Sequence, residues 1–226
     1  MSVVVTTLSG GLDSVTLAHA LAADGLDLIA LSFHYGQRHA KELDQAVRCA
    51  DRLGAEHHVV DLRSVGALLT GSALTDAGVE VPEGHYTDMS MATTVVPNRN
   101  AIMLSVAVGV AVARDAGAVA TAVHAGDHAV YPDCRPAFIE AIEHEARVAN
   151  EGFIADDFAV LAPFLRLSKD EIVRRGAALG VPFEETWSCY LGEELHCGRC
   201  GTCVERREAF ELAAIPDPTR YAAVSV

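Results

Sequence analysis

The sequence has few basic residues for its acidic content, and this deficit limits what the protein can bind. Lys and Arg number 17 against 31 Asp and Glu in 226 residues, so the net charge is −14 with histidine neutral. The phosphates of nucleic acids repel such a chain, which makes tRNA and DNA poor candidates for a substrate. A small molecule is the better candidate.

A segment that could cross a membrane or direct secretion is also lacking. The longest apolar run, 101–113, is flanked by Arg99 and Arg114 and is shorter than the roughly 20 residues that a membrane span needs. The first residues contain no basic region, no long apolar stretch and no small-residue cleavage site. We therefore expect a cytoplasmic protein without membrane contact, and a buried helix at 101–113.

Repeats, low-complexity tracts and clear linkers are absent too. With 50% hydrophobic and 21% charged residues, the chain can bury one large core. Strand-like apolar runs occur at 3–8, 26–33, 57–62 and 118–124. Helical patterns separate them, and this alternation predicts an α/β fold, a parallel sheet with helices on both faces. We expect residues 1–186 to form the main domain and residues 187–226 a short tail packed on it as one structural unit.

A glycine-rich loop follows the first predicted strand and opens a helix. Its sequence is Ser9-Gly10-Gly11-Leu12-Asp13-Ser14. Free backbone N–H groups and the positive end of the helix favour an anion there, and Ser9 and Ser14 can hydrogen-bond it. Asp13 is suited to holding Mg²⁺ or orienting the loop. No lysine ends the motif, so it is not a Walker A loop. The alternative is an ordinary strand-to-helix turn.

In this context the loop resembles the pyrophosphate loop of the ATP pyrophosphatase superfamily, also called the PP-loop superfamily. Members of that superfamily adenylate a carbonyl oxygen and release pyrophosphate. The resemblance implies that the chain uses ATP and cleaves it between the α- and β-phosphates.

Four cysteines crowd the C-terminal part of the sequence. They are Cys189, Cys197, Cys200 and Cys203. A reducing compartment disfavours disulfides, and four thiolates at this spacing can close a tetrahedral Zn²⁺ shell. A closed shell leaves no position for catalytic water, so its role is expected to be structural. An iron–sulfur cluster is the alternative, although the Cys-Pro that completes a ferredoxin motif is missing.

Polar residues between these two motifs follow predicted strands or begin helices. They are Arg38, His39, Arg99, Asn100, Asp127, Tyr131, Asp133 and Arg135. Ligands of parallel sheets bind beyond the carboxyl ends of the strands, so we expect these residues to share a crevice with the glycine loop. The arginines suit phosphates or a substrate carboxylate. Taken singly, each residue is also explained as a solvated or core side chain.

Lys169 lies in a capping box formed by Ser168 and Glu171. A lysine is electrostatically disfavoured at the positive end of a helix. It therefore serves either as a phosphate contact or as an ordinary solvated side chain.

Together these residues resemble the QueC family of 7-cyano-7-deazaguanine synthases. The matching positions, in chain order, are 9–14, 34–39, Glu42, Val96-Pro97, Arg99-Asn100, Asp127, 131–135, Phe138, Lys169, 188–190, Cys197-Gly198, Cys200 and Cys203. They span nearly the whole chain. The loop 124–128 departs from the family pattern, with only Asp127 matching.

The resemblance implies an adenine nucleotide alpha-hydrolase-like fold and a ligase reaction that turns 7-carboxy-7-deazaguanine and ammonia into the nitrile with two ATP. It implies Mg²⁺, a structural Zn²⁺ at the four cysteines, and a homodimer. It assigns ATP binding to Leu8, Ser9, Gly10, Gly11, Leu12, Asp13, Ser14, Val15, Thr16, Leu17 and Ala18. It assigns catalysis or substrate binding to Arg38, His39, Arg99, Asn100, Asp127, Tyr131, Asp133, Arg135 and Lys169.

Three alternatives remain open at this point. The first is a paralogue that adenylates a deazaguanine carboxylate and joins it to another acceptor as an amide. The second is a tRNA-modifying member of the same superfamily, against which the acidic charge argues. The third is a non-catalytic zinc- and nucleotide-binding module, which the intact glycine loop disfavours.

Overall fold

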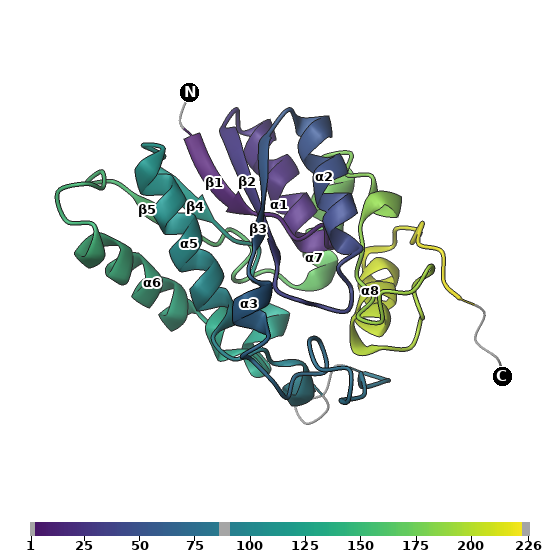
Figure 1. Cartoon of the computed structure of the whole chain (residues 1–226). Coiled ribbons are helices and arrows are strands. Elements are labelled where there is room, and N and C mark those ends of the chain that lie inside the picture. Colours follow the sequence, from purple (N-terminus) through teal and green to yellow (C-terminus); the bar gives the residue numbers. More distant parts are fainter. Residues whose placement is uncertain (1–2, 86–90, 223–226) are drawn as a thin grey trace.

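A five-stranded parallel sheet forms the centre of the molecule in a computed structural model that describes residues 3–85 and 91–222 (Figure 1). The strands are β1 (Val3–Thr7), β2 (Asp27–His34), β3 (Glu56–Asp61), β4 (Ala118–Ala120) and β5 (Ala159–Leu161). Their order is β3-β2-β1-β4-β5, and every neighbouring pair is parallel. The predicted α/β class is confirmed. The short β5 was not predicted, and β4 ends four residues before its predicted limit.

Helices cover both faces of the sheet, as predicted. They are α1 (Leu12–Ala23), α2 (Glu42–Leu53), α3 (Arg63–Gly66), α5 (Arg99–Ala113), α6 (Pro136–Ala149), α7 (Lys169–Ala178) and α8 (Gly201–Ala213). Four 3₁₀ turns lie between them, at η1 (Ala92–Thr94), η2 (Ala125–Ala129), η3 (Pro132–Cys134) and η4 (Phe183–Glu185). Figure 1 shows α5 and α6 on one side of the sheet and α1, α2 and α7 on the other.

Alternate residues of the central strands feed two separate cores. In β1, Val4 packs with α1, α2, α7 and α8, whereas Val5 packs with α5 and α6. Because successive side chains of a strand point to opposite faces, a strand covered on both sides reads as one continuous apolar run. This explains why six consecutive residues of β2 are buried, while the edge strand β3 is largely exposed.

The apolar run at 101–113 lies in α5, which turns only part of its surface inward. Leu104, Ala107, Val108 and Ala111 are buried, and they recur at helical spacing. The expected buried helix is therefore an amphipathic one. No helix in the described parts of the chain has the length and apolar character to span a membrane.

The C-terminal helix α8 joins the core that contains α1, α2 and α7. Ala209, Phe210 and Ala213 pack there. Arg206, on the same helix, has no exposed surface, and its guanidinium donates to Thr186 Oγ1 at 2.7 Å and to the Phe183 carbonyl at 2.9 Å. These contacts hold the segment before the cysteines against the rest of the molecule.

Candidate active site

A pocket of about 260 Å³ opens at the carboxyl ends of β1, β2 and β4. Open parallel sheets place ligand sites at this edge, because the loops that leave the strands diverge there. Its polar lining consists of Thr7, Ser9, Asp13, Ser14, His39, Glu42, Arg99, Asn100, Thr121, His124, Asp127, Lys169, Ser188, Thr202 and Glu205, with Tyr35, Tyr131, Tyr190 and Trp187. The glycine loop, most of the predicted polar residues and the C-terminal segment thus meet in one cavity.

The glycine loop presents an open helix N-terminus to this pocket. Gly11 is the N-cap residue of α1, and no side chain caps the helix within the described structure. The Ser9 and Ser14 hydroxyl oxygens lie 3.0 Å apart, and the Ser14 hydroxyl donates to the Gly11 carbonyl at 3.1 Å. The open N-terminus of α1 therefore faces the pocket, and the two hydroxyls beside it could turn from their contacts within the loop to an anion.

Gly10 is required because the loop packs directly against α2. Its φ is +88°, and a Cβ at this position would lie 2.0 Å from the Glu42 carbonyl oxygen. The Trp187 N–H donates to the Gly10 carbonyl at 2.9 Å. The loop is consequently fixed between α2 and the segment that precedes the cysteines.

Lys169 lies at the centre of a charged network beside the loop. Its Nζ lies 2.6 Å from Asp13 Oδ2, 3.4 Å from Glu205 Oε2 and 3.3 Å from His124 Nε2. Burial lowers the pKa of the Lys169 ammonium, but the charges of Asp13, Glu205 and Asp127 outweigh it and hold that pKa above its usual range. Burial likewise raises the pKa of Asp13, and Lys169 with His124 brings it below the usual value. Lys169 is a partly buried, ion-paired cation, not a fully solvated lysine.

His124 forms part of the loop that departs from the family pattern. Its Nδ1 accepts a hydrogen bond from the Gly126 N–H at 3.1 Å. Its Nε2 lies 3.6 Å from Asp127 Oδ2 and 3.9 Å from Asp13 Oδ2. Sequence reasoning did not include His124 among the site residues, although the departure of its loop marked the position.

Glu42 and His39 occupy another part of the pocket wall. His39 Nε2 lies 3.5 Å from Glu42 Oε1, and Gln37 Nε2 donates to the same oxygen at 3.4 Å. Burial raises the pKa of Glu42 to about 8 and lowers the pKa of His39 to about 3. Arg99 lies nearby and donates to Tyr35 Oη at 3.4 Å. Its pKa stays above the ordinary arginine value, because the surrounding tyrosines outweigh the effect of burial.

Three predicted site residues do not line the pocket. Arg38 donates to the Val79 carbonyl at 2.8 Å and also to the Asp76 carbonyl, so it holds a loop. Asp133 accepts from the Asn100 N–H at 3.2 Å, near the start of α5. Arg135 donates to the His128 carbonyl at 2.8 Å. Backbone carbonyls and a helix start bind these groups, although Arg38 Nε keeps no hydrogen-bond partner among the described residues, and sequence spacing does not reveal such partners.

The predicted ATP segment also divides in two. Leu8, Ser9, Gly11, Leu12, Asp13 and Ser14 line the pocket. Val15, Thr16, Leu17 and Ala18 are buried along α1 and do not reach it. Helical geometry directs them into the core, whereas the loop before the helix remains open to the cavity.

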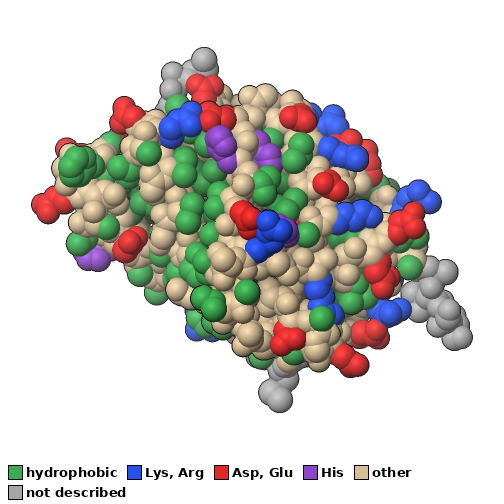
Figure 2. Space-filling model, viewed as in Figure 1, with side chains coloured by type: hydrophobic (Ala, Val, Ile, Leu, Met, Phe, Trp, Pro, Cys, Tyr) green, Lys and Arg blue, Asp and Glu red, His purple; other side chains and the backbone are tan. Residues whose placement is uncertain are grey.

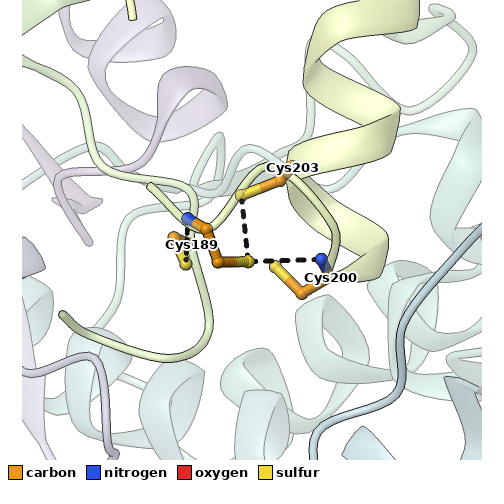
Figure 3. Close-up of side chains that lie close together, drawn as sticks. Cys189, Cys200 and Cys203 are labelled. Atoms are coloured by element: carbon orange, nitrogen blue, oxygen red, sulfur yellow. Dashed lines mark hydrogen bonds between the residues drawn. The ribbon is translucent and has the colours of Figure 1, made fainter. Parts of the chain in front are cut away.

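The four cysteines form a compact, buried cluster. Figure 3 labels three of them, Cys189, Cys200 and Cys203. Their sulfur atoms all lie within 4.8 Å of one another, and Cys197 Sγ is 3.9 Å from Cys203 Sγ. A tetrahedral zinc with 2.3 Å bonds separates its sulfurs by about 3.8 Å, so the spacing fits a single ion. Cys197 Sγ accepts hydrogen bonds from the Cys200 N–H at 3.3 Å and from the Arg199 N–H at 3.5 Å, which suits a thiolate ligand.

The segment around this cluster contributes one wall of the pocket. Trp187, Ser188 and Tyr190 flank the first cysteine, and Thr202 and Glu205 extend from the start of α8. The sequence resemblance included Ser188 and Tyr190 among its matching positions but assigned them no role, and it did not include Trp187, Thr202 or Glu205. Their polar and aromatic side chains can be read from the sequence, but only the fold brings Glu205 next to Lys169.

Comparison with known proteins gives consistent relatives. A family model described as "Queuosine biosynthesis protein QueC" matches residues 3–214. A protein from Rhizobium johnstonii named 7-cyano-7-deazaguanine synthase is 59% identical over 217 residues, which cover 96% of this chain and 91% of the relative. A protein of the same name from Paracoccus denitrificans is 60% identical over 217 residues, covering 96% and 92%.

Solved structures share the fold at low sequence identity. NMN synthetase from Francisella tularensis has a TM-score of 0.52 at 16% identity, over 94% of this chain and 77% of that one. The U34-tRNA thiolase NcsA from Methanococcus maripaludis, solved with its [4Fe-4S] cluster, has a TM-score of 0.50 at 16% identity, over 93% and 65%. These similarities establish the architecture alone.

Proposed function

Because the chain belongs to the QueC family of queuosine biosynthesis proteins, we propose that it converts 7-carboxy-7-deazaguanine and ammonia to 7-cyano-7-deazaguanine with ATP. The observation that carries the proposal is the open N-terminus of α1, with Ser9 and Ser14, beside a pocket of about 260 Å³. This arrangement suits an ATP whose pyrophosphate leaves as the α-phosphate is transferred.

In the proposed reaction a carboxylate oxygen of the substrate attacks the α-phosphorus, and pyrophosphate leaves with the electron pair of the broken bond. Ammonia then attacks the acyl carbon, and AMP leaves to give the amide. The amide oxygen attacks the α-phosphorus of a second ATP, and a second pyrophosphate leaves. Loss of AMP and of the two N–H protons then gives the nitrile. Ser9, Ser14 and the α1 N–H groups bind the pyrophosphate, and the Lys169 ammonium offsets its charge.

We assign the divalent cation of this reaction to the carboxylates beside Lys169. Asp13 Oδ1 is buried and has no hydrogen-bond partner among the described residues, which leaves a lone pair for a ligand. Asp127 and Glu205 line the same part of the pocket. Carboxylate oxygens are the ligands that Mg²⁺ prefers, and the ion would offset charge on the transferred phosphates.

We assign a structural Zn²⁺ to Cys189, Cys197, Cys200 and Cys203. The four buried sulfurs support this role, because a complete thiolate shell leaves no open position for catalysis. Metal analysis of the purified protein tests the assignment. One zinc per chain is expected. Iron together with acid-labile sulfide would instead identify an iron–sulfur cluster and contradict the zinc assignment.

We further propose a homodimer in the cytoplasm, where reduced cysteines persist. The edge strand β3 supports the dimer, because Val59 on it is 50% exposed. Figure 2 shows apolar side chains interspersed on this face of the molecule. Sedimentation of the protein and its Val59→Lys variant tests the arrangement. A dimer that the variant dissociates is expected, and a monomeric parent protein contradicts it.

Mass spectrometry of the products tests the proposed function directly. The protein is incubated with 7-carboxy-7-deazaguanine, ammonium, ATP and Mg²⁺, and the nitrile is expected. An amide as the final product would favour a paralogue with another acceptor, and no pyrophosphate release would exclude catalysis on this substrate. The names of the relatives favour neither alternative.

A further inference from the structure

The pocket contains two kinds of partly buried carboxylate. Asp13 is paired with the Lys169 ammonium at 2.6 Å. Glu42, whose side chain is 12% exposed, forms no salt bridge with Lys or Arg in the described parts of the chain, and its ionic neighbour is His39 Nε2 at 3.5 Å. An unpaired carboxylate in a buried wall costs free energy, which is unexpected unless the group has a task.

Glu42 lies beside the place where the acyl group must react. It is the first residue of α2, and its carbonyl oxygen packs against Gly10 of the glycine loop. The loop holds the pyrophosphate in the proposed function, so the α-phosphate and the carbon bonded to it lie at the loop's margin. Glu42 lines the pocket there together with Arg99 and Tyr35.

The proposed chemistry releases protons from nitrogen, and no residue has yet been assigned to accept them. Attack by ammonia forms a C–N bond and leaves a positively charged nitrogen, which must lose a proton as AMP departs. The adenylated amide carries two N–H protons. Both must leave as the C–O bond breaks, with the N–H electrons forming the nitrile and the C–O electrons departing with AMP.

We propose that Glu42 is the catalytic base that accepts these nitrogen-bound protons, an assignment that rests on the proposed function. Its carboxylate takes one proton at a time from nitrogen and passes it to solvent between steps. Adenylation of the carboxylate breaks no N–H bond, so it does not need this residue. The network around Lys169 serves the phosphates, and Glu42 serves the nitrogen.

The surroundings of Glu42 support a group that exchanges protons near neutral pH. Burial raises its pKa to about 8, while the Gln37 amide and the Arg99 guanidinium lower it by less. His39 is neutral because burial lowers its pKa to about 3. Tyr35, which lines the same wall, is held neutral by burial, which raises its pKa. Tyr131, Tyr190 and Arg99 also line the pocket, and the position of Glu42 beside the glycine loop distinguishes it from them.

Two partial reactions of the Glu42→Gln variant test the assignment. The first is ATP–pyrophosphate exchange with 7-carboxy-7-deazaguanine and no ammonia, which reports adenylation alone. The second is conversion of the amide to the nitrile with ATP, which needs proton removal but no ammonia. We expect exchange within threefold of the parent protein and a loss of about 100-fold or more in nitrile formation. Glu145→Gln, on the exposed face of α6, is the control and should change neither.

Parallel losses in both reactions would overturn the assignment, because they would make Glu42 a positioning residue for ATP or substrate. Nitrile formation at the parent rate would overturn it as well. Failure of the proposed function looks different, since the parent protein itself would then show no carboxylate-dependent exchange. A Glu42→Asp variant that keeps a measurable nitrile rate above that of Glu42→Gln would support a carboxylate in this role.

Discussion

Single residues of this site carry either phosphate contacts or charge, and their effects should separate. Ser14 donates to the Gly11 carbonyl and accepts from the Ser9 N–H at 3.2 Å, both within the glycine loop. Ser14 lines the pocket, and its hydroxyl contacts the pyrophosphate in the proposed function. The loop backbone is also held by α2 and Trp187, so the fold does not depend on this hydroxyl alone.

Ser14→Ala should therefore reduce turnover far more than stability. We expect kcat/KM for ATP to fall by about 100-fold or more, as when a preorganised donor is removed from a transition state. One net hydrogen bond is worth about 1 kcal/mol, so the melting temperature should fall by only a few degrees. Steady-state pyrophosphate release and thermal melting measure the two effects. An equal loss of stability and activity would show that Ser14 holds the loop together.

Glu42→Gln should make the protein more stable above neutral pH. An unfolded glutamate ionises near 4.5, whereas burial raises the pKa of Glu42 to about 8 in the folded state. Between these values the folded protein holds the extra proton, so the free energy of unfolding falls as pH rises from about 4.5 to about 8. The amide has no proton to lose, and it should add roughly 1–3 kcal/mol at pH 8.

Urea denaturation at pH 5 and pH 8 measures this difference. The stability gain should be confined to the higher pH, while Glu145→Gln on exposed α6 should show no pH-dependent gain. A variant less stable than the parent at pH 8 would mean that the Glu42 carboxylate is stabilised by its surroundings.

At the scale of elements, α8 is held to η4 by one buried guanidinium. Arg206 donates to Thr186 and Ser188 side chains at 2.7 and 3.2 Å, and it lies 3.4 Å from Asp217 Oδ1. Ser188 lines the pocket, so this contact also orients the wall of the site.

Arg206→Met should lower the free energy of unfolding by about 3–5 kcal/mol, because it leaves buried polar partners without a donor. Chemical denaturation measures the loss. The neighbouring Arg207 is exposed on the same helix, and Arg207→Met should cost no more than about 0.5 kcal/mol. Similar losses in the two variants would refute the anchoring role.

The elements that could be predicted are those with a local signal. The strand, glycine loop and helix from Val3 to Ala23 carry β-branched residues, glycines and a helical pattern in immediate succession. The three residues of β5 are too few to show a period. Arg38 and Arg135 were placed in the crevice because they follow strands or begin a helix, and sequence does not show that backbone carbonyls already bind them.

At the scale of the molecule, the cysteine cluster and the pocket share one segment of chain. Cys200 is the N-cap residue of α8, and Thr202 and Glu205 extend from the same helix into the pocket. The clustering of cysteines could be predicted from their spacing. The position of the cluster beside the pocket could not be predicted. The contact between Glu205 and Lys169 joins two segments that lie far apart in the sequence and meet only in the folded chain.

Loss of the metal should consequently weaken nucleotide binding. Cys200→Ser is expected to release zinc, to lower the melting temperature, and to raise the Kd for ATP by tenfold or more as the α8 wall loosens. Metal analysis, thermal melting and calorimetry with ATP measure the three effects. Cys49→Ser provides the control, since Cys49 lies in the core away from the cluster. Stoichiometric zinc and unchanged melting in Cys200→Ser would contradict the structural role.

The contact between the glycine loop and the C-terminal wall also determines when the pocket can form during synthesis. Residues 9–14 leave the ribosome early, and residues 187–205 follow only after all five strands have been made. A nascent chain can form the sheet first, as N-terminal segments usually do, yet it has no complete nucleotide site. The growing polypeptide therefore completes the pocket only once the C-terminal segment has packed against the glycine loop.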